Sequence, residues 1–171
     1  MKTVTLLRKQ LNLAHDWFEG TMADVTQEQA DIQPAGTAHS IASRYAHLVV
    51  GEDILINSVV RGGAPMYAGE YAGKTGISEP RLDSPLEWAR SVRVDMDSAR
   101  RYAQAVYANS DAYLSTLQEA DLERTVDLSE MNMGQWTLDA FLLGLVIGHV
   151  RDIMGEVSAL KGTQGLQGYP F

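Results

Sequence analysis

The feature that most constrains this chain is the stretch at residues 136–162, which is apolar on almost every side when wound as a helix. Its apolar members are Leu138, Phe141, Leu142, Leu143, Leu145, Val146, Ile147, Val150, Ile153, Met154, Val157 and Leu160. A helix that is apolar nearly all round is a buried one, so we expect it at the centre of a helical domain. Thr137 is its expected N-cap.

Three further helices are predicted from apolar residues that recur at helical spacing. The first covers about residues 4–24, the second runs from residues 37–40 to residue 60, and the third covers about residues 85–118. Thr26 and Gln29 stand in capping-box positions and predict a short turn after the first helix. We expect any bend of the third helix near residues 109–111.

The connections between these helices are long. Residues 64–83 form an irregular stretch, and such loops are functional or ordered by packing; we expect a cover over one end of the helices. Residues 121–128 are expected to form a linker, extended in part. With no alternating strand pattern, the sequence predicts an all-α four-helix bundle with long crossover connections, built as one domain over residues 1–171.

Composition excludes several classes of function. The 14 basic residues are outnumbered by 22 acidic ones, and the net charge of -8 argues against binding to nucleic acid or to an anionic membrane surface. The absence of cysteine excludes thiolate metal ligands and a cysteine nucleophile. The first residues lack a signal-peptide core, and the longest apolar run, residues 140–148, is about half the length of a membrane span, so we expect a cytoplasmic protein.

Two histidines stand out among the four in the chain. His47 and His149 each lie among apolar residues near the middle of a predicted helix. A buried imidazole needs a partner, and two interpretations follow. Either both rings are core side chains bonded to neighbouring polar groups, or they are metal ligands, for which neutral imidazole is well suited.

The segments around these histidines carry a family resemblance. YAHLVVGED, which contains His47, and GHVRDIMGE, which contains His149, resemble the DinB-like (DinB/YfiT) superfamily of metal-dependent four-helix bundles. HDWFEGTMADVT near the start and ALKGTQGLQGYPF at the end resemble one branch of it. The resemblance implies a metal site made by one histidine on the second helix and an H-x-x-x-H pair on the fourth.

Matched position by position, the chain departs from that pattern at one ligand. His47 and His149 match two of the ligands, but the third position holds Ile153, whose side chain cannot bind a metal. Asp152 and Glu156 are the candidate surrogate or supporting groups beside it. His15 and Glu52 are further candidates for the pocket.

Two functions remain open at this stage. The first is a bundle with a degraded metal site, non-catalytic or weakly metal-binding, that binds a small molecule. The second, implied by the resemblance, is a metal-dependent hydrolase or a transferase that uses low-molecular-weight thiols, with Zn, Ni or Mn held by His47 and His149. By analogy with the family, a homodimer is expected in either case.

Overall fold

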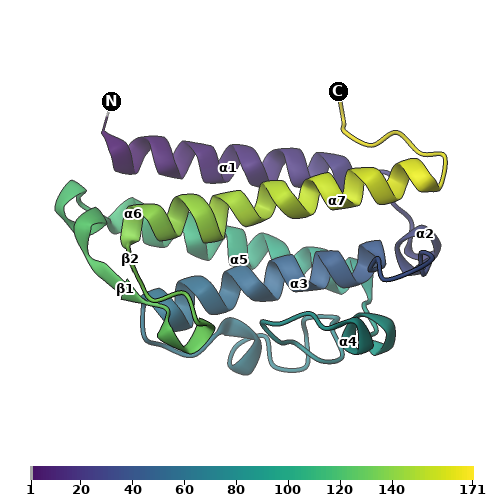
Figure 1. Cartoon of the computed structure of the whole chain (residues 1–171), viewed down its shortest axis with the longest axis horizontal. Coiled ribbons are helices and arrows are strands. Elements are labelled where there is room, and N and C mark those ends of the chain that lie inside the picture. The colour runs from purple at the N-terminus through teal and green to yellow at the C-terminus, as the bar shows by residue number, and fades with distance from the viewer. Residues whose placement is uncertain (1) are drawn as a thin grey trace.

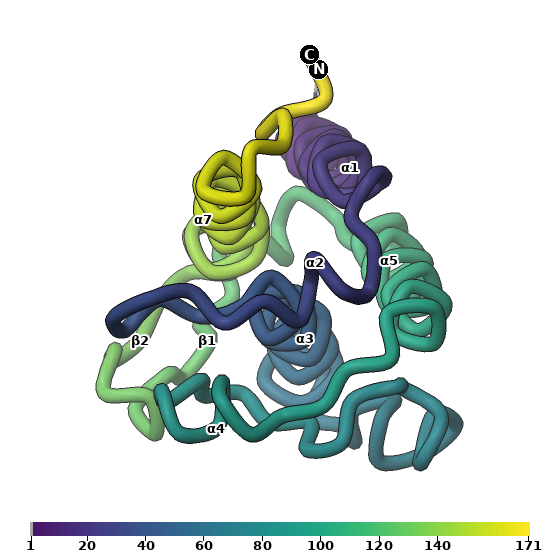
Figure 2. Tube along the Cα trace, turned by 90° about the vertical axis from the view of Figure 1, so that its right-hand side faces the viewer, coloured from purple at the N-terminus to yellow at the C-terminus, as the bar shows by residue number. Residues whose placement is uncertain are grey.

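Four long helices, packed side by side, make up the body of the molecule. The computed structural model describes residues 2–171, and the four helices are α1 (Thr3–Met22), α3 (Ile41–Asp53), α5 (Met96–Thr116) and α7 (His149–Thr163). Each of α1 and α3 packs against both α5 and α7, and the end-on view in Figure 2 shows the four in a ring. The colours of Figure 1 show that α1 and α7 run in one direction and α3 and α5 in the other. The predicted four-helix bundle with long crossover connections is therefore confirmed.

The first helix and the turn after it form as their sequences predict. α1 buries Leu7, Leu11, Ala14, Phe18 and Met22, which recur at helical spacing along its inner face. α2 (Gln27–Asp31) then begins with a complete capping box, in which Thr26 and Gln29 satisfy each other's backbone N–H groups.

The second long helix continues beyond α3 with a change in its winding. Ser40 caps α3 by accepting a hydrogen bond from the Ser43 N–H at 3.2 Å. After Asp53 the chain continues as the π-helical segment Ile54–Val60 and ends at Gly62, whose φ of 68° is left-handed.

The prediction of one continuous third helix is wrong, because this part of the chain forms two helices. α4 (Leu86–Ser91) is short, and the break at residues 92–95 separates it from α5. Asp95 makes the break, because its carboxylate accepts a hydrogen bond from the Ser98 N–H at 2.8 Å and so caps a new helix. Residues 109–111, where we expected a bend, lie inside α5.

The long connection between α3 and α5 covers the outer side of α3 (Figures 1 and 2). The expectation that it covers one end of the bundle is therefore wrong. The chain has to return along the whole length of α3, because α3 and α5 run in the same direction. The connection contains a 3₁₀ turn at Met66–Ala68, and Ile77 forms an isolated bridge with Val94.

A small hairpin leads into the last helix. β1 (Thr125–Asp127) pairs antiparallel with β2 (Gln135–Thr137), and the helix continues through α6 (Leu138–Phe141), the π-helical segment Leu142–Gly148 and α7. Trp136 therefore lies in a strand and not in the helix. Thr137 is the N-cap residue, but its side chain forms no capping hydrogen bond.

The last helix is less buried than its composition predicts. Leu143 is 58% exposed, so the helix belongs to the ring of four and is not enclosed by the others. The tail crosses back over α1, where Phe171 packs against Trp17 with ring centroids 5.3 Å apart. No helix within residues 2–171 combines the length and the apolar character needed to cross a bilayer.

Candidate metal and small-molecule site

The rings of His47 and His149 meet between two helices of the bundle. His47 lies on α3 and His149 is the first residue of α7, and their Nε2 atoms are 3.2 Å apart. The ring centroids are 4.9 Å apart and the ring planes meet edge to face at 82°. The structure thus brings together the two histidines that sequence reasoning singled out.

Two local features position His149. Its ring lies against the backbone of Gly51, one turn after His47, where an added Cβ would be 3.6 Å from the His149 Cε1 atom. The π-helical segment Leu142–Gly148 directly precedes it. Such wide turns are rare in proteins and are found frequently at functional sites.

Burial favours the neutral form of both histidines. Burial, together with the neighbouring His149, lowers the pKa of His47 to about 4. Burial also lowers the pKa of His149, although the negative charges of Asp152 and Glu52 oppose the shift. A neutral imidazole can offer the nitrogen lone pair that a metal ion requires.

The Nε2–Nε2 distance fits two ligands of one metal ion. Two imidazole nitrogens bound to zinc at about 2.0–2.1 Å with a tetrahedral angle lie roughly 3.3 Å apart. The observed 3.2 Å matches that value. The buried Nδ1 atom of His47 forms no hydrogen bond of normal geometry, although the Leu82 backbone lies near enough to favour the protonated ring slightly.

The histidine pair opens onto a cavity of about 620 Å³. The cavity is walled mainly by aliphatic side chains, with carboxylates and the two histidines among them. Its lining residues are His47, Leu55, Leu82, Asp83, Glu130, Met131, Gly144, Leu145, His149 and Asp152. Pockets that bind small molecules have this composition, an apolar wall with a few polar groups.

The relatives of the chain agree with this architecture. The sequence profile of the DinB superfamily matches residues 10–152. The chain belongs to the DinB superfamily. No curated protein matches it in sequence.

Two solved structures share the fold. A conserved protein from Enterococcus faecalis superposes with a TM-score of 0.79 at 23% identity, over 96% of this chain and 99% of that one. YfiT from Bacillus subtilis, described as a probable metal-dependent hydrolase with an unusual four-helix bundle topology, superposes with a TM-score of 0.66 at 18% identity, over 96% of this chain and 89% of that one. At these identities the similarity shows the fold alone.

The third ligand position of the DinB pattern lies in the hydrophobic core. Ile153 is 2% exposed and is not part of the cavity wall. Of the two candidate surrogates, Asp152 is exposed and lines the cavity, whereas Glu156 pairs with Arg44 of α3 at 2.7 Å. Within residues 2–171 no group of three or more histidine, aspartate or glutamate side chains is placed to hold one metal ion.

His15 and Glu52 lie outside this cavity and bind each other. The His15 Nε2 atom is 2.7 Å from the Glu52 Oε2 atom, and both side chains are buried in the bundle. The His15 ring also stacks on Tyr107, with centroids 3.8 Å apart. His15 and Glu52 therefore form a separate polar pair. The pair affects the histidine site through the negative charge of Glu52, which opposes the lowering of the His149 pKa.

Sequence reasoning missed the part of the cavity wall that does not come from the long helices. Leu82 and Asp83 come from the connection after α3, and Glu130 and Met131 come from the turn between β1 and β2. The path of the two connections brings these residues to the site. The helical spacing of apolar residues does not predict that path, so it could not identify them.

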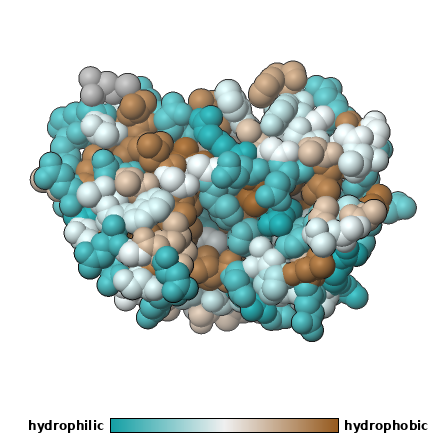
Figure 3. Space-filling view, viewed as in Figure 1, coloured by the Kyte–Doolittle hydropathy of each residue, from teal (hydrophilic) through white to brown (hydrophobic). Residues whose placement is uncertain are grey.

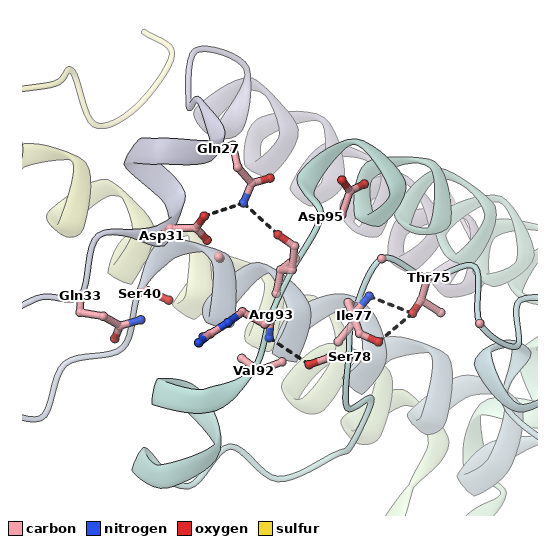
Figure 4. A pocket seen from close by; sticks show the side chains of 14 residues that line it. Gln27, Asp31, Gln33, Ser40, Thr75, Ile77, Ser78, Val92, Arg93 and Asp95 are labelled. Carbon is pink, nitrogen blue, oxygen red and sulfur yellow. Dashed lines mark hydrogen bonds between the residues drawn. The ribbon is translucent and has the colours of Figure 1, made fainter.

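A larger cavity, of about 790 Å³, lies between α2, the start of α3 and the segment before α5 (Figure 4). Several of its polar groups are already bonded to one another. Gln27 donates to Asp31 and to the Val94 carbonyl, each at 2.9 Å, and the Arg93 N–H donates to Ser78 at 2.9 Å. We interpret these contacts as the packing that joins the connection to the bundle.

Proposed function

We propose that this chain binds a small, largely apolar molecule in the cavity at His47 and His149, and that these two histidines hold a divalent metal ion weakly. The observation that supports the proposal most directly is the 3.2 Å separation of the two Nε2 atoms at the wall of the cavity. Zn, Ni and Mn are the candidate ions, because imidazole nitrogen suits the first two and the nearby carboxylates suit Mn.

Weak binding follows from the number of protein ligands. Two imidazoles fill two coordination positions, and Ile153, which is buried in the hydrophobic core, has no donor atom for a third. The other positions would be taken by water or by a donor atom of the bound molecule. When bound, the ion would act as a Lewis acid that lowers the pKa of a coordinated water or thiol.

A second candidate function is metal-dependent hydrolysis, and Asp152 is the observation that favours it. Its carboxylate lines the same cavity, and its charge favours the protonated form of His149. In that role Asp152 would accept a proton from water beside the histidine pair. The name given to YfiT, a probable metal-dependent hydrolase, also supports this alternative.

Calorimetric titration of the chelated protein with Zn, Ni and Mn tests the metal site. We expect one weak site in the wild-type protein and none in His47→Ala or His149→Ala. His39→Gln is the matched control, because this histidine lies outside the cavity wall, and its titration should equal that of the wild type. Binding that survives in His149→Ala, or no binding by the wild type, would overturn the proposal.

Asp152→Asn separates the two candidate functions. With metal present, turnover of a p-nitrophenyl ester that falls by about 100-fold or more in this variant would favour the hydrolase, because general acid–base catalysis contributes that much. No turnover by either protein would favour the binder.

A further inference from the structure

The cavity at the histidine pair shares part of its wall with a second one. A neighbouring cavity of about 470 Å³ shares Leu82, Glu130 and Met131 with it. The second cavity adds aliphatic side chains from the π-helical segment after α3, Ile54 and Val59. We refer to the two cavities together as the groove; the histidines lie in the wall of the first, and Glu130 lies in the wall that both share.

The charged residues of this groove are all acidic. Asp83, Asp127, Glu130 and Asp152 line it, and its described lining includes neither lysine nor arginine. A groove lined by charge of one sign raises the local concentration of molecules with the opposite charge.

Two of the four carboxylates already have partners. Arg81 binds Asp83 through two hydrogen bonds, of 2.6 and 2.7 Å, which neutralises its charge. Asp127 accepts the Ser129 N–H at 2.9 Å. Glu130 and Asp152 form no hydrogen bond or ion pair with any side chain or backbone group in the part of the chain that the structure describes.

One cation lies near the histidine pair and is already paired. Arg44 lies close enough to lower the pKa of both histidines, but Glu156 pairs with it at 2.7 Å. The groove is thus apolar along most of its wall and carries three carboxylates, Asp127, Glu130 and Asp152, that form no ion pair within residues 2–171. Of these, Asp152 lies beside His149, and Glu130 lies in the wall that the two cavities share.

From this arrangement we propose that the bound molecule is an amine with an extended apolar body. Its hydrocarbon would lie along Leu55, Leu82 and Leu145, and its ammonium group would pair with Glu130. The inference rests on the proposed function only in using the same cavity, and it concerns the charge of the ligand and not the metal.

A set of probes of equal chain length tests the inference: 1-octylamine, 1-octanol and octanoate, titrated by calorimetry into the metal-free protein. We expect octylamine to bind about fivefold tighter than octanol, the upper value for one partly exposed ion pair. Octanoate should bind more weakly than octanol. Because no metal is present, failure of the metal site would not change this result.

Two variants locate the charge effect. Glu130→Gln should bring the affinity for octylamine down to that for octanol while leaving octanol unchanged, since the Glu130 side chain is exposed and forms no hydrogen bond or ion pair within residues 2–171. Asp16→Asn, an exposed acid on α1, should change neither affinity. Equal binding of the three probes, tighter binding of octanoate, no binding of any probe, or an amine preference that persists in Glu130→Gln would each overturn the proposal.

Discussion

Ile153 marks the difference between this chain and the three-histidine pattern that its family resemblance implies. The side chain is 2% exposed, and it lies on α7 four residues after His149, on the same side of the helix. An imidazole at this position would be directed toward the same region as the His149 ring. The substitution of one residue therefore removes a ligand and adds to the hydrophobic core at the same time.

Ile153→His should restore tight metal binding and reduce stability without metal. We expect the affinity for Zn to rise at least about tenfold. A group that only supports a ligand contributes about that much to metal affinity, and a direct ligand should contribute no less. Without metal, the buried polar ring should lower the free energy of unfolding by about 1–3 kcal/mol. Urea denaturation with and without Zn measures both effects.

Ile153→Gln is the control for this experiment, because it adds a polar group of similar size without an imidazole. It should destabilise the protein and leave Zn affinity unchanged. Equal Zn affinity in Ile153→His and the wild type would show that position 153 does not face the histidine pair.

The shifted pKa of His47 predicts a pH dependence of stability in the metal-free protein. The unfolded chain takes up a proton at His47 near pH 6.5, whereas the folded protein does so only near pH 4, because the ring is buried. Between these values the unfolded state binds more protons, so the free energy of unfolding falls as pH decreases. The full loss amounts to about 3 kcal/mol and is complete below pH 4.

Urea denaturation of the chelated protein between pH 7 and pH 4.5, compared with His47→Leu, isolates this contribution. The wild type should lose more stability than the variant over this range. Parallel pH profiles of the two proteins would contradict the assignment of a neutral, buried His47.

At the scale of whole elements, the sequence predicted the helices better than their interruptions. Val92, Met96 and Ala99 are all buried and keep helical spacing across the break between α4 and α5. Periodicity alone therefore concealed the cap that Asp95 forms. The π-helical segments were also not predicted, because an extra residue in a turn leaves an apolar pattern that resembles an ordinary helix.

Asp53 fixes the long connection to the bundle. Its carboxylate is buried and accepts hydrogen bonds from the backbone N–H groups of Met66 and Tyr67, at 2.9 and 3.1 Å. It also accepts from Asn57 at 2.7 Å and from the Tyr102 hydroxyl at 2.5 Å. One side chain at the end of α3 thus holds the first part of a connection that later contributes Leu82 and Asp83 to the cavity.

Asp53→Ala should lower the free energy of unfolding by about 2–4 kcal/mol, because it leaves four donors without their acceptor. Glu70→Ala, an exposed acid in the same connection, should change it by less than about 0.5 kcal/mol. Urea denaturation compares the two. A loss as small in Asp53→Ala as in Glu70→Ala would show that the connection is held by other contacts.

At the scale of the molecule, the four-helix architecture explains which parts of the site could be predicted. His47 and His149 lie on α3 and α7, which pack against each other, so their meeting depends on helix packing that the family resemblance implies. The remainder of the wall depends on how the α3–α5 connection and the β1–β2 hairpin fold over α3, and residue spacing carries no information about that path.

The expected homodimer stays a prediction. On the face shown in Figure 3, hydrophobic residues lie in separate areas divided by hydrophilic ones. The large apolar side chains that remain exposed include Leu6, Leu13 and Trp17 of α1. Sedimentation equilibrium measures the oligomeric state directly.

The most direct test of the metal site is an anomalous difference map from crystals of this protein soaked with Zn. The proposed site predicts one peak between the two rings, about 2.0–2.1 Å from the Nε2 atoms of His47 and His149, with its other ligands drawn from solvent or a small molecule. Crystals that show no peak at this position, or a zinc ion held by other residues, would contradict it.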